Sequence, residues 1–202
     1  ASTREKSLVE IPAVNWVEYK EIDKFYLDPL VQLDNLVNSK MADYVSQFIL
    51  HGSIATKDYI KGWSDVDTLI VVKKDTLESA SRPNEFRDLC LKADKYLSLV
   101  DPLKHHGLIY CAEHDLENYA SNIMPIEVLQ NAVSLLRNNR VFSCRLAENN
   151  YDSRLMFSNR VKVFKEASKT GIFKHHMKDG KYLTSRLPKN NDVLYQLKYF
   201  LG

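Results

Sequence analysis

The sequence contains few of the residues that mark special architectures. Among its 202 residues are only 3 Cys, 6 Gly and 6 Pro, and its longest purely aliphatic run is the four residues 69–72. The low glycine and proline content excludes collagen-like and low-complexity architectures, and a run of four falls far short of the ~20 residues that span a bilayer. Cys90, Cys111 and Cys144 are scattered and odd in number, so they predict neither a disulfide framework nor a CxxC zinc site. This cysteine usage favours a reducing cytoplasm.

Charge is nearly balanced over the whole chain, but it is unevenly distributed. The net charge is +2, whereas residues 1–150 hold 17 Lys and Arg against 22 Asp and Glu, a net of −5. Residues 151–202 hold 11 against 4, a net of +7. Such a basic quarter is typical either of contact with an anion, such as a nucleotide phosphate or a nucleic acid, or of a solvated lysine-rich surface.

Hydrophobic periodicity predicts a mixed α/β fold. Apolar residues at helical spacing predict one or two helices over residues 18–40. Apolar and β-branched runs predict strands over 45–50, 66–72 and 106–111, and a helix over 83–101 connects the last two. The order α-β-β-α-β predicts a small mixed sheet of the α+β kind.

Strand signals fade after the third predicted strand. Helical patterns follow over 125–136 and 152–167, and a last short helix is predicted over 193–200, with loops between them. The sequence therefore predicts a core with an N-terminal helical extension over residues 1–120, followed by a basic, helical C-terminal subdomain over 121–202.

The clearest chemistry lies in segment 48–72. An apolar strand ends in Gly52-Ser53, where a glycine lets a ligand approach the backbone closely and a hydroxyl follows it. Asp65 and Asp67 stand two residues apart at the start of the next apolar strand, so their carboxylates share one face. Two such carboxylates repel each other unless a cation lies between them, and hard oxygen ligands suit Mg²⁺, which completes its shell with water and phosphate oxygens. The pattern predicts a metal–phosphate site.

The segment GSIATKDYIKGWSDVD, residues 52–67, resembles the motif of the DNA polymerase beta-like nucleotidyltransferase superfamily. In that motif Gly-Ser is followed, after roughly nine to thirteen residues, by Asp-x-Asp at the head of an apolar strand. The inner pattern is most similar to the minimal and aminoglycoside-type nucleotidyltransferases. The resemblance implies that Gly52 and Ser53 bind the triphosphate of an NTP and that Asp65 and Asp67 bind Mg²⁺, with a two-metal site as the expected arrangement.

The sequence departs from that superfamily at a third carboxylate, which the family usually places early in the following strand. Here the position falls on or near His106, which suits a base or ligand because its ordinary pKa lies near neutrality. Asp101 could instead reach in from the preceding loop, and Glu113 or Asp115 could supply the acid if the strand register differs. A fourth alternative is a site without a third ligand that turns over slowly or not at all.

The resemblance implies a Mg²⁺-dependent enzyme that transfers a nucleoside monophosphate from an NTP to a hydroxyl acceptor and releases pyrophosphate. The modest length and the acidic first 150 residues favour a small-molecule acceptor, whereas the basic final quarter fits a nucleic acid or a protein. The alternative of a different class is a non-catalytic nucleotide-binding or toxin–antitoxin-like regulatory module. No membrane partner is expected.

Overall fold

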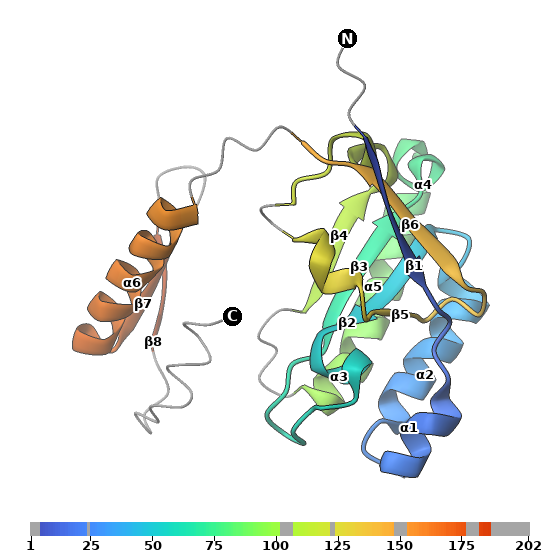
Figure 1. Cartoon of the computed structure of the whole chain (residues 1–202), viewed down its shortest axis with the longest axis horizontal. Coiled ribbons are helices and arrows are strands. Elements are labelled where there is room, and N and C mark those ends of the chain that lie inside the picture. The colour runs from blue at the N-terminus through green and yellow to red at the C-terminus, as the bar shows by residue number, and fades with distance from the viewer. Residues whose placement is uncertain are drawn as a thin grey trace. The chain divides into compact units, whose positions relative to one another are not determined.

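The computed structural model describes residues 5–23, 25–101, 107–121, 124–147, 153–176 and 182–186. The chain forms two compact units, residues 1–149 and residues 150–202 (Figure 1). The helices and strands of the first unit are β1 (Lys6–Ile11), α1 (Trp16–Ile22), α2 (Asp28–Leu36), the π-helical turn η1 (Val37–Met41), β2 (Val45–His51), α3 (Gly52–Thr56), β3 (Asp67–Val72), α4 (Lys74–Glu78), α5 (Arg82–Val100), β4 (Leu108–Ala112), the 3-10 turns η2 (Glu113–Asn118) and η3 (Ile126–Leu129), β5 (Val133–Ser134) and β6 (Arg140–Arg145). Those of the second unit are α6 (Ser153–Thr170), β7 (Ile172–His176) and β8 (Tyr182–Arg186).

A four-stranded mixed sheet forms the centre of the first unit. Its strand order is β4-β3-β2-β5, with β2 antiparallel to both β3 and β5 and β3 parallel to β4. Helix α5 makes the crossover that a parallel connection requires. The mixed α+β fold predicted from the sequence, and the order of its first three sheet strands, are therefore confirmed.

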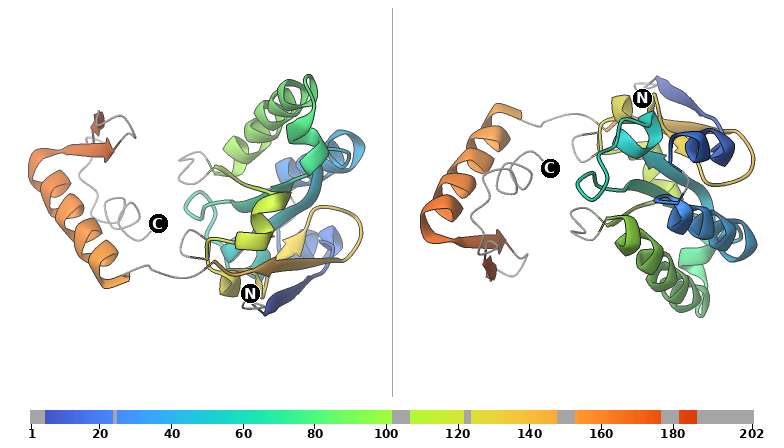
Figure 2. Two further views of the ribbon diagram at one scale, coloured as in Figure 1. Left: turned by 90° about the horizontal axis from the view of Figure 1, so that it is seen from above. Right: turned by 90° about the horizontal axis from the view of Figure 1, so that it is seen from below.

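The two faces of the sheet are covered by different elements. Strand β3 alternates, so that Ile70 belongs to the core that includes residues of α2 and α5, whereas Leu69 and Val71 belong to a second core that includes Phe142 of β6. Figure 2 shows α5 on one side of the sheet and the β1–β6 pair on the other. Because successive side chains point to opposite faces, Asp67 lies on the same face as Leu69 and Val71.

The boundary predicted after residue 120 lies elsewhere in the structure, because residues 124–147 pack into the first unit. Strand β5 bonds to β2, and β6 pairs along its whole length with β1, a strand that the sequence analysis missed. The helix predicted over 125–136 is wrong: only the 3-10 turn η3 forms there. Its apolar residues, among them Leu129 and Leu135, are buried, but they fill the two cores from a turn and a short strand rather than from one helical face.

The second unit combines a helix with a hairpin. Helix α6 confirms the helix predicted over 152–167, whereas the antiparallel pair β7–β8 occupies a stretch that was expected to be a loop. The predicted helix over 193–200 lies outside the described residues. In the described part of the chain, no helix combines the length and the apolar character needed to cross a membrane.

Candidate active site

The turn after β2 brings the two sequence motifs into contact. Gly52 adopts φ +67° and begins the short helix α3, and positive φ values are costly for residues that carry a Cβ. A Cβ at position 52 would lie less than 3.0 Å from Oδ2 of Asp67 and 3.3 Å from its Cγ. The Asp67 carboxylate therefore faces the backbone of the Gly52-Ser53 turn directly.

Burial alternates along the aspartate pair. Val66 is only 1% exposed and packs in the core beneath the helices, while Asp65 and Asp67 on either side of it are half-buried. Alternation along an extended chain places the side chains of both aspartates away from Val66, on a shared face. Strand β3 begins at Asp67, so Asp65 lies in the extended segment just before it.

The loop between the two motifs is attached to the N-terminal helices. The Tyr26 hydroxyl accepts a hydrogen bond from the backbone N–H of Gly62 (2.8 Å) and donates one to the carbonyl of Val100 (2.9 Å). Asp23 forms an ion pair with Lys61, and the hydrogen bond from Lys61 lowers the pKa of the Asp23 carboxyl. These contacts hold the segment that leads to the aspartate pair against α1, α2 and the end of α5.

Asp101 is brought to the aspartate pair from the C-terminal end of α5. Its side chain is 4% exposed, and its Oδ2 accepts a hydrogen bond from the backbone N–H of Val66 at 3.5 Å. Asp101 therefore contacts the backbone between the two aspartates. Of the three candidates for the third carboxylate, Asp101, Glu113 and Asp115, the structure places Asp101 beside the aspartate pair.

Glu113 and Asp115 are not brought to this site. Glu113 accepts a hydrogen bond from the backbone N–H of Lys74 (3.1 Å), at the end of β3 where Val72 pairs with β4. That end is roughly 16 Å along the strand from Asp67, at about 3.3 Å per residue. Asp115 instead accepts from the backbone N–H at the end of β4.

The described part of β4 carries no acid. Its sequence is LIYCA, so the carboxylate that the family usually places early in this strand is missing from residues 108–112. His106, the first choice for base from the sequence, lies outside the described residues.

His51 is a residue near the site that the sequence analysis missed. It stands directly opposite Asp67 in the antiparallel register of β2 and β3 and is 7% exposed. Directly opposed residues share a face, with Cβ atoms about 4.5–5.5 Å apart. Its place just before Gly52-Ser53 was visible in the sequence, but its pairing with Asp67 depends on a register that only the folded sheet defines.

The donor set fits a Mg²⁺ ion that is shared with a substrate. The described residues contain no group of three or more His, Cys, Asp or Glu side chains that could hold a metal by themselves. Mg²⁺ usually takes only one or two protein carboxylates and completes its shell with water and substrate phosphates. Asp65 and Asp67 supply those two carboxylates, and Gly52 leaves open the space beside Asp67 that a Cβ would fill.

Comparison with known proteins gives a match to a protein family. The family model of the nucleotidyltransferase domain matches residues 33–128, from α2 to η3, and this range includes both the Gly52-Ser53 turn and the aspartate pair. Among the curated proteins and the solved structures, no match to the chain was found. The resemblance drawn from the sequence is confirmed over this range.

Proposed function

We propose that this chain catalyses the Mg²⁺-dependent transfer of a nucleoside monophosphate from an NTP to the hydroxyl group of a small molecule. Its residues 33–128 match the family model of the nucleotidyltransferase domain. The observation that supports this most directly is the close approach of Asp67 to the backbone of Gly52. It joins a carboxylate pair to a glycine turn that is followed by a hydroxyl, which is the combination that a metal-bound triphosphate needs.

Each residue then has a defined role. The backbone of Gly52 and the hydroxyl of Ser53 bind the β- and γ-phosphates, and Asp65 and Asp67 would hold Mg²⁺. When bound, the metal neutralises charge on the triphosphate. The acceptor oxygen forms a bond to the α-phosphorus, the bond from that phosphorus to the bridging oxygen breaks, and pyrophosphate leaves with the electron pair. The acceptor proton passes to a general base, which we assign to His106 on its sequence position and its ordinary pKa.

Binding and pyrophosphate release together test this function. Thermal unfolding of the full chain is followed with each NTP, with and without Mg²⁺, and pyrophosphate release is measured with a panel of small alcohols. Stabilisation by an NTP and Mg²⁺ together with acceptor-dependent release supports the enzyme. Stabilisation without release for any acceptor would instead identify a non-catalytic nucleotide-binding module, and no stabilisation by any NTP would exclude both.

The assignment of the base predicts opposite results for two substitutions. His106→Gln is expected to lower kcat by about 100-fold or more, the usual scale of general-base catalysis. Asp101→Asn keeps an oxygen that can accept a hydrogen bond from the Val66 N–H, so we expect it to retain kcat within a few-fold. Asp101→Ala removes this hydrogen bond and should loosen the segment around Val66. The measurement is kcat against pH for the three variants. If Asp101→Asn loses activity and His106→Gln does not, Asp101 is the third acid and our assignment is wrong.

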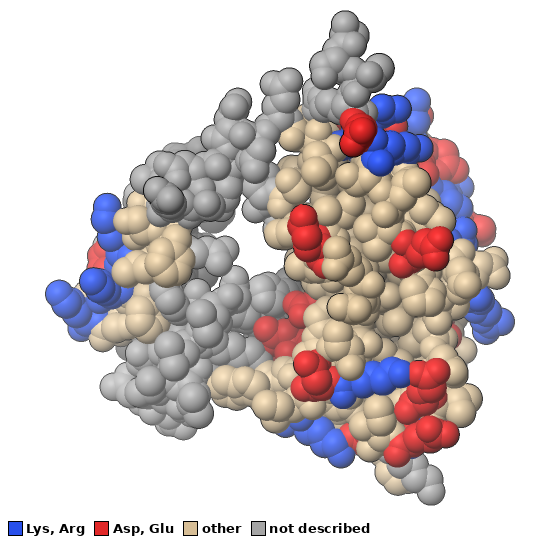
Figure 3. Space-filling view, viewed as in Figure 1, with Lys and Arg blue, Asp and Glu red and all other residues tan. Residues whose placement is uncertain are grey.

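A nucleic-acid acceptor is the second candidate, and the charge of the second unit favours it. Residues 150–202 hold 11 Lys and Arg against 4 Asp and Glu. Figure 3 shows Lys and Arg side chains along the described part of α6, where Lys162, Lys165 and Lys169 are exposed at a spacing that places them on one helix face.

Salt dependence distinguishes the two acceptor classes. For a small acceptor we expect weak binding of RNA and DNA oligonucleotides to the full chain that changes little between 50 and 200 mM salt (about the range over which phosphate contacts show). For a nucleic-acid acceptor the affinity falls by about one log unit per log unit of salt for each phosphate contacted, and replacing the three lysines by glutamine reduces that slope. Tight, steeply salt-dependent binding would overturn the small-molecule proposal.

The proposal includes a cytoplasmic location. Cys90, Cys111 and Cys144 are all free thiols in the structure, and free thiols of this kind are typical of proteins in reducing compartments.

A further inference from the structure

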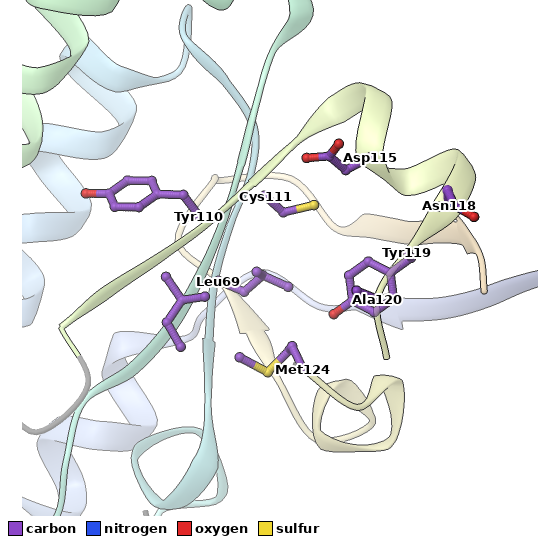
Figure 4. A pocket seen from close by; sticks show the side chains of 9 residues that line it. Leu69, Tyr110, Cys111, Asp115, Asn118, Tyr119, Ala120 and Met124 are labelled. Carbon is purple, nitrogen blue, oxygen red and sulfur yellow. The ribbon is translucent and has the colours of Figure 1, made fainter. Parts of the chain in front are cut away.

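A small pocket lies on the face of the sheet that carries Asp67. Its volume is about 250 Å³. Its apolar wall is formed by Leu69 of β3, Ile109 and Cys111 of β4, and by Tyr119 and Met124 (Figure 4). Its polar groups, Asp115 and Asn118, come from η2. The pocket therefore has an apolar lining, and η2 supplies two polar side chains to it.

The pocket begins close to the aspartate pair. Leu69 follows Asp67 by two residues on the same face of β3, a separation of about 7 Å along the strand, and Ile109 is its partner in the register of β3 and β4. Strand β3 lies between β2 and β4. The pocket is thus on the β4 side of Asp67, while the Gly52-Ser53 turn is on the β2 side.

The geometry of in-line transfer indicates whether the β4 side of Asp67 holds the acceptor or the leaving pyrophosphate. The attacking and leaving oxygens lie on opposite sides of the phosphorus. Because the Gly52-Ser53 turn is proposed to hold the triphosphate, the leaving pyrophosphate lies toward β2. The acceptor oxygen must then approach Asp67 from the β4 side, where the pocket is.

A buried hydroxyl points into the pocket without a partner. Tyr119 is 4% exposed, and its ring packs edge-to-face against Phe142 with centroids 5.4 Å apart. Its Oη has no hydrogen-bond partner among the described residues, and Figure 4 shows it directed inward, toward the side of Leu69 and Met124. A buried hydroxyl without a partner destabilises the fold because it has lost its hydrogen bonds to water, and a ligand with one polar group would replace such a bond.

We propose that this pocket binds the acceptor, and that the acceptor is a small, uncharged and largely apolar alcohol about one ring in size. The inference rests on the proposed function and extends it. The volume lies just below the ~300–1,000 Å³ of pockets for drug-sized ligands, so a single ring fits and a nucleic-acid chain does not. The carboxylate of Asp115 beside the pocket and the aspartate pair beyond it disfavour an anionic acceptor.

Protection of Cys111 tests binding without any NTP. Burial raises the pKa of the Cys111 thiol to about 11, so its thiolate fraction, and with it the rate of alkylation by iodoacetamide, rises about tenfold per pH unit below that value. At pH 9 we expect benzyl alcohol and cyclohexanol to slow alkylation of Cys111 saturably, by fivefold or more, in the full chain. Glycerol and a dinucleotide serve as polar and anionic comparators and should not protect; Cys90, which lies in the other core, is the internal control.

Two variants identify the pocket as the place of binding. Tyr119→Phe removes the unpartnered hydroxyl but keeps the ring, so it should leave the urea midpoint unchanged or raise it while weakening protection by benzyl alcohol fivefold or more. Ala120→Phe adds a ring to the pocket lining and should abolish protection. Tyr44→Phe removes a hydroxyl that is bonded to Glu85 at a distant position, and it should not change protection.

Transfer assays separate failure of the pocket from failure of the proposed function. With NTP and Mg²⁺, the expected result is pyrophosphate release with benzyl alcohol or cyclohexanol, and a KM for the alcohol that rises fivefold or more in Tyr119→Phe while kcat changes little. The inference is overturned if no probe protects Cys111, or if the alcohols still protect Cys111 in Ala120→Phe. It is also overturned if pyrophosphate release requires a polar acceptor whose KM changes in neither variant, and in that case the proposed enzyme activity stands without the pocket. If the alcohols bind but no acceptor supports release, the proposed function fails and the acceptor role fails with it.

Discussion

Replacing Asp67 with asparagine is expected to lower the rate of nucleotidyl transfer by at least about 100- to 1,000-fold, the scale of losing one major charge-stabilising group. Asparagine has the shape of aspartate, so it fits beside Gly52, where the carboxylate now lies. It lacks the negative charge that binds Mg²⁺. Because the change also removes repulsion from Asp65, we expect the urea midpoint to stay unchanged or to rise.

The control for this substitution changes the same charge elsewhere. Asp88 is an exposed carboxylate on α5 that forms an ion pair with the neighbouring Arg87, and Asp88→Asn should leave both rate and stability unaltered. Pyrophosphate release against Mg²⁺ concentration, together with urea unfolding, measures both quantities for both variants. Wild-type turnover in Asp67→Asn would remove the basis of the nucleotidyltransferase mechanism proposed for this site.

The position of this site was predictable from the sequence because its signals are local. Gly52, Ser53, Asp65 and Asp67 flank two apolar runs whose strand character is clear from β-branched content alone. Strand alternation then places the two carboxylates together without any knowledge of the fold. The family resemblance implied that Gly52 and Ser53 bind the triphosphate and that the aspartates bind Mg²⁺, and the structure adds the close approach of Asp67 to Gly52.

What the sequence could not provide depends on pairings between distant segments. The register that sets His51 opposite Asp67 and the placement of Asp101 beneath Val66 arise only when the strands and α5 have packed. The same holds for the pocket at Tyr119, whose walls come from β3, β4 and the segment after η2. His51, Asp101 and Tyr119 lie outside the Gly-Ser and Asp-x-Asp motifs, so no local pattern fixes their positions in the fold.

The largest error in the fold has the same cause. Strands β1 and β6 pair across more than 120 residues. Ile11 of β1 and Phe142 and Cys144 of β6 are buried in the same core, and Ile11 is the one fully buried residue of β1. The short strand β5 consists of two residues, far below the length at which alternation can be recognised. Apolar residues from 125 to 136 therefore matched a helix by spacing, although tertiary pairing places them in a turn and a strand.

Gly52→Ala is expected to remove activity without a matching loss of stability. The added Cβ would lie less than 3.0 Å from Oδ2 of Asp67, so the carboxylate must rotate away from the turn. The moving atom is the end of a side chain rather than backbone, so the cost in folding is mainly that of a positive φ, about 1–2 kcal/mol. We expect NTP affinity in the presence of Mg²⁺ to fall by at least about tenfold and turnover by about 100-fold or more, because Asp67 no longer faces the phosphates.

Gly62→Ala is the matched control, because Gly62 has a similar φ of +71° and its added Cβ would meet nothing within 4 Å. Both variants should lose similar stability in urea, while only Gly52→Ala loses NTP binding, measured by calorimetry, and turnover. The double variant of Gly52→Ala and Asp67→Asn should be little worse than Asp67→Asn alone, since both changes act through one carboxylate. If Gly52→Ala binds NTP as the wild type does, or if the two losses simply add, the turn does not act through Asp67 and the phosphate role of Gly52 is wrong.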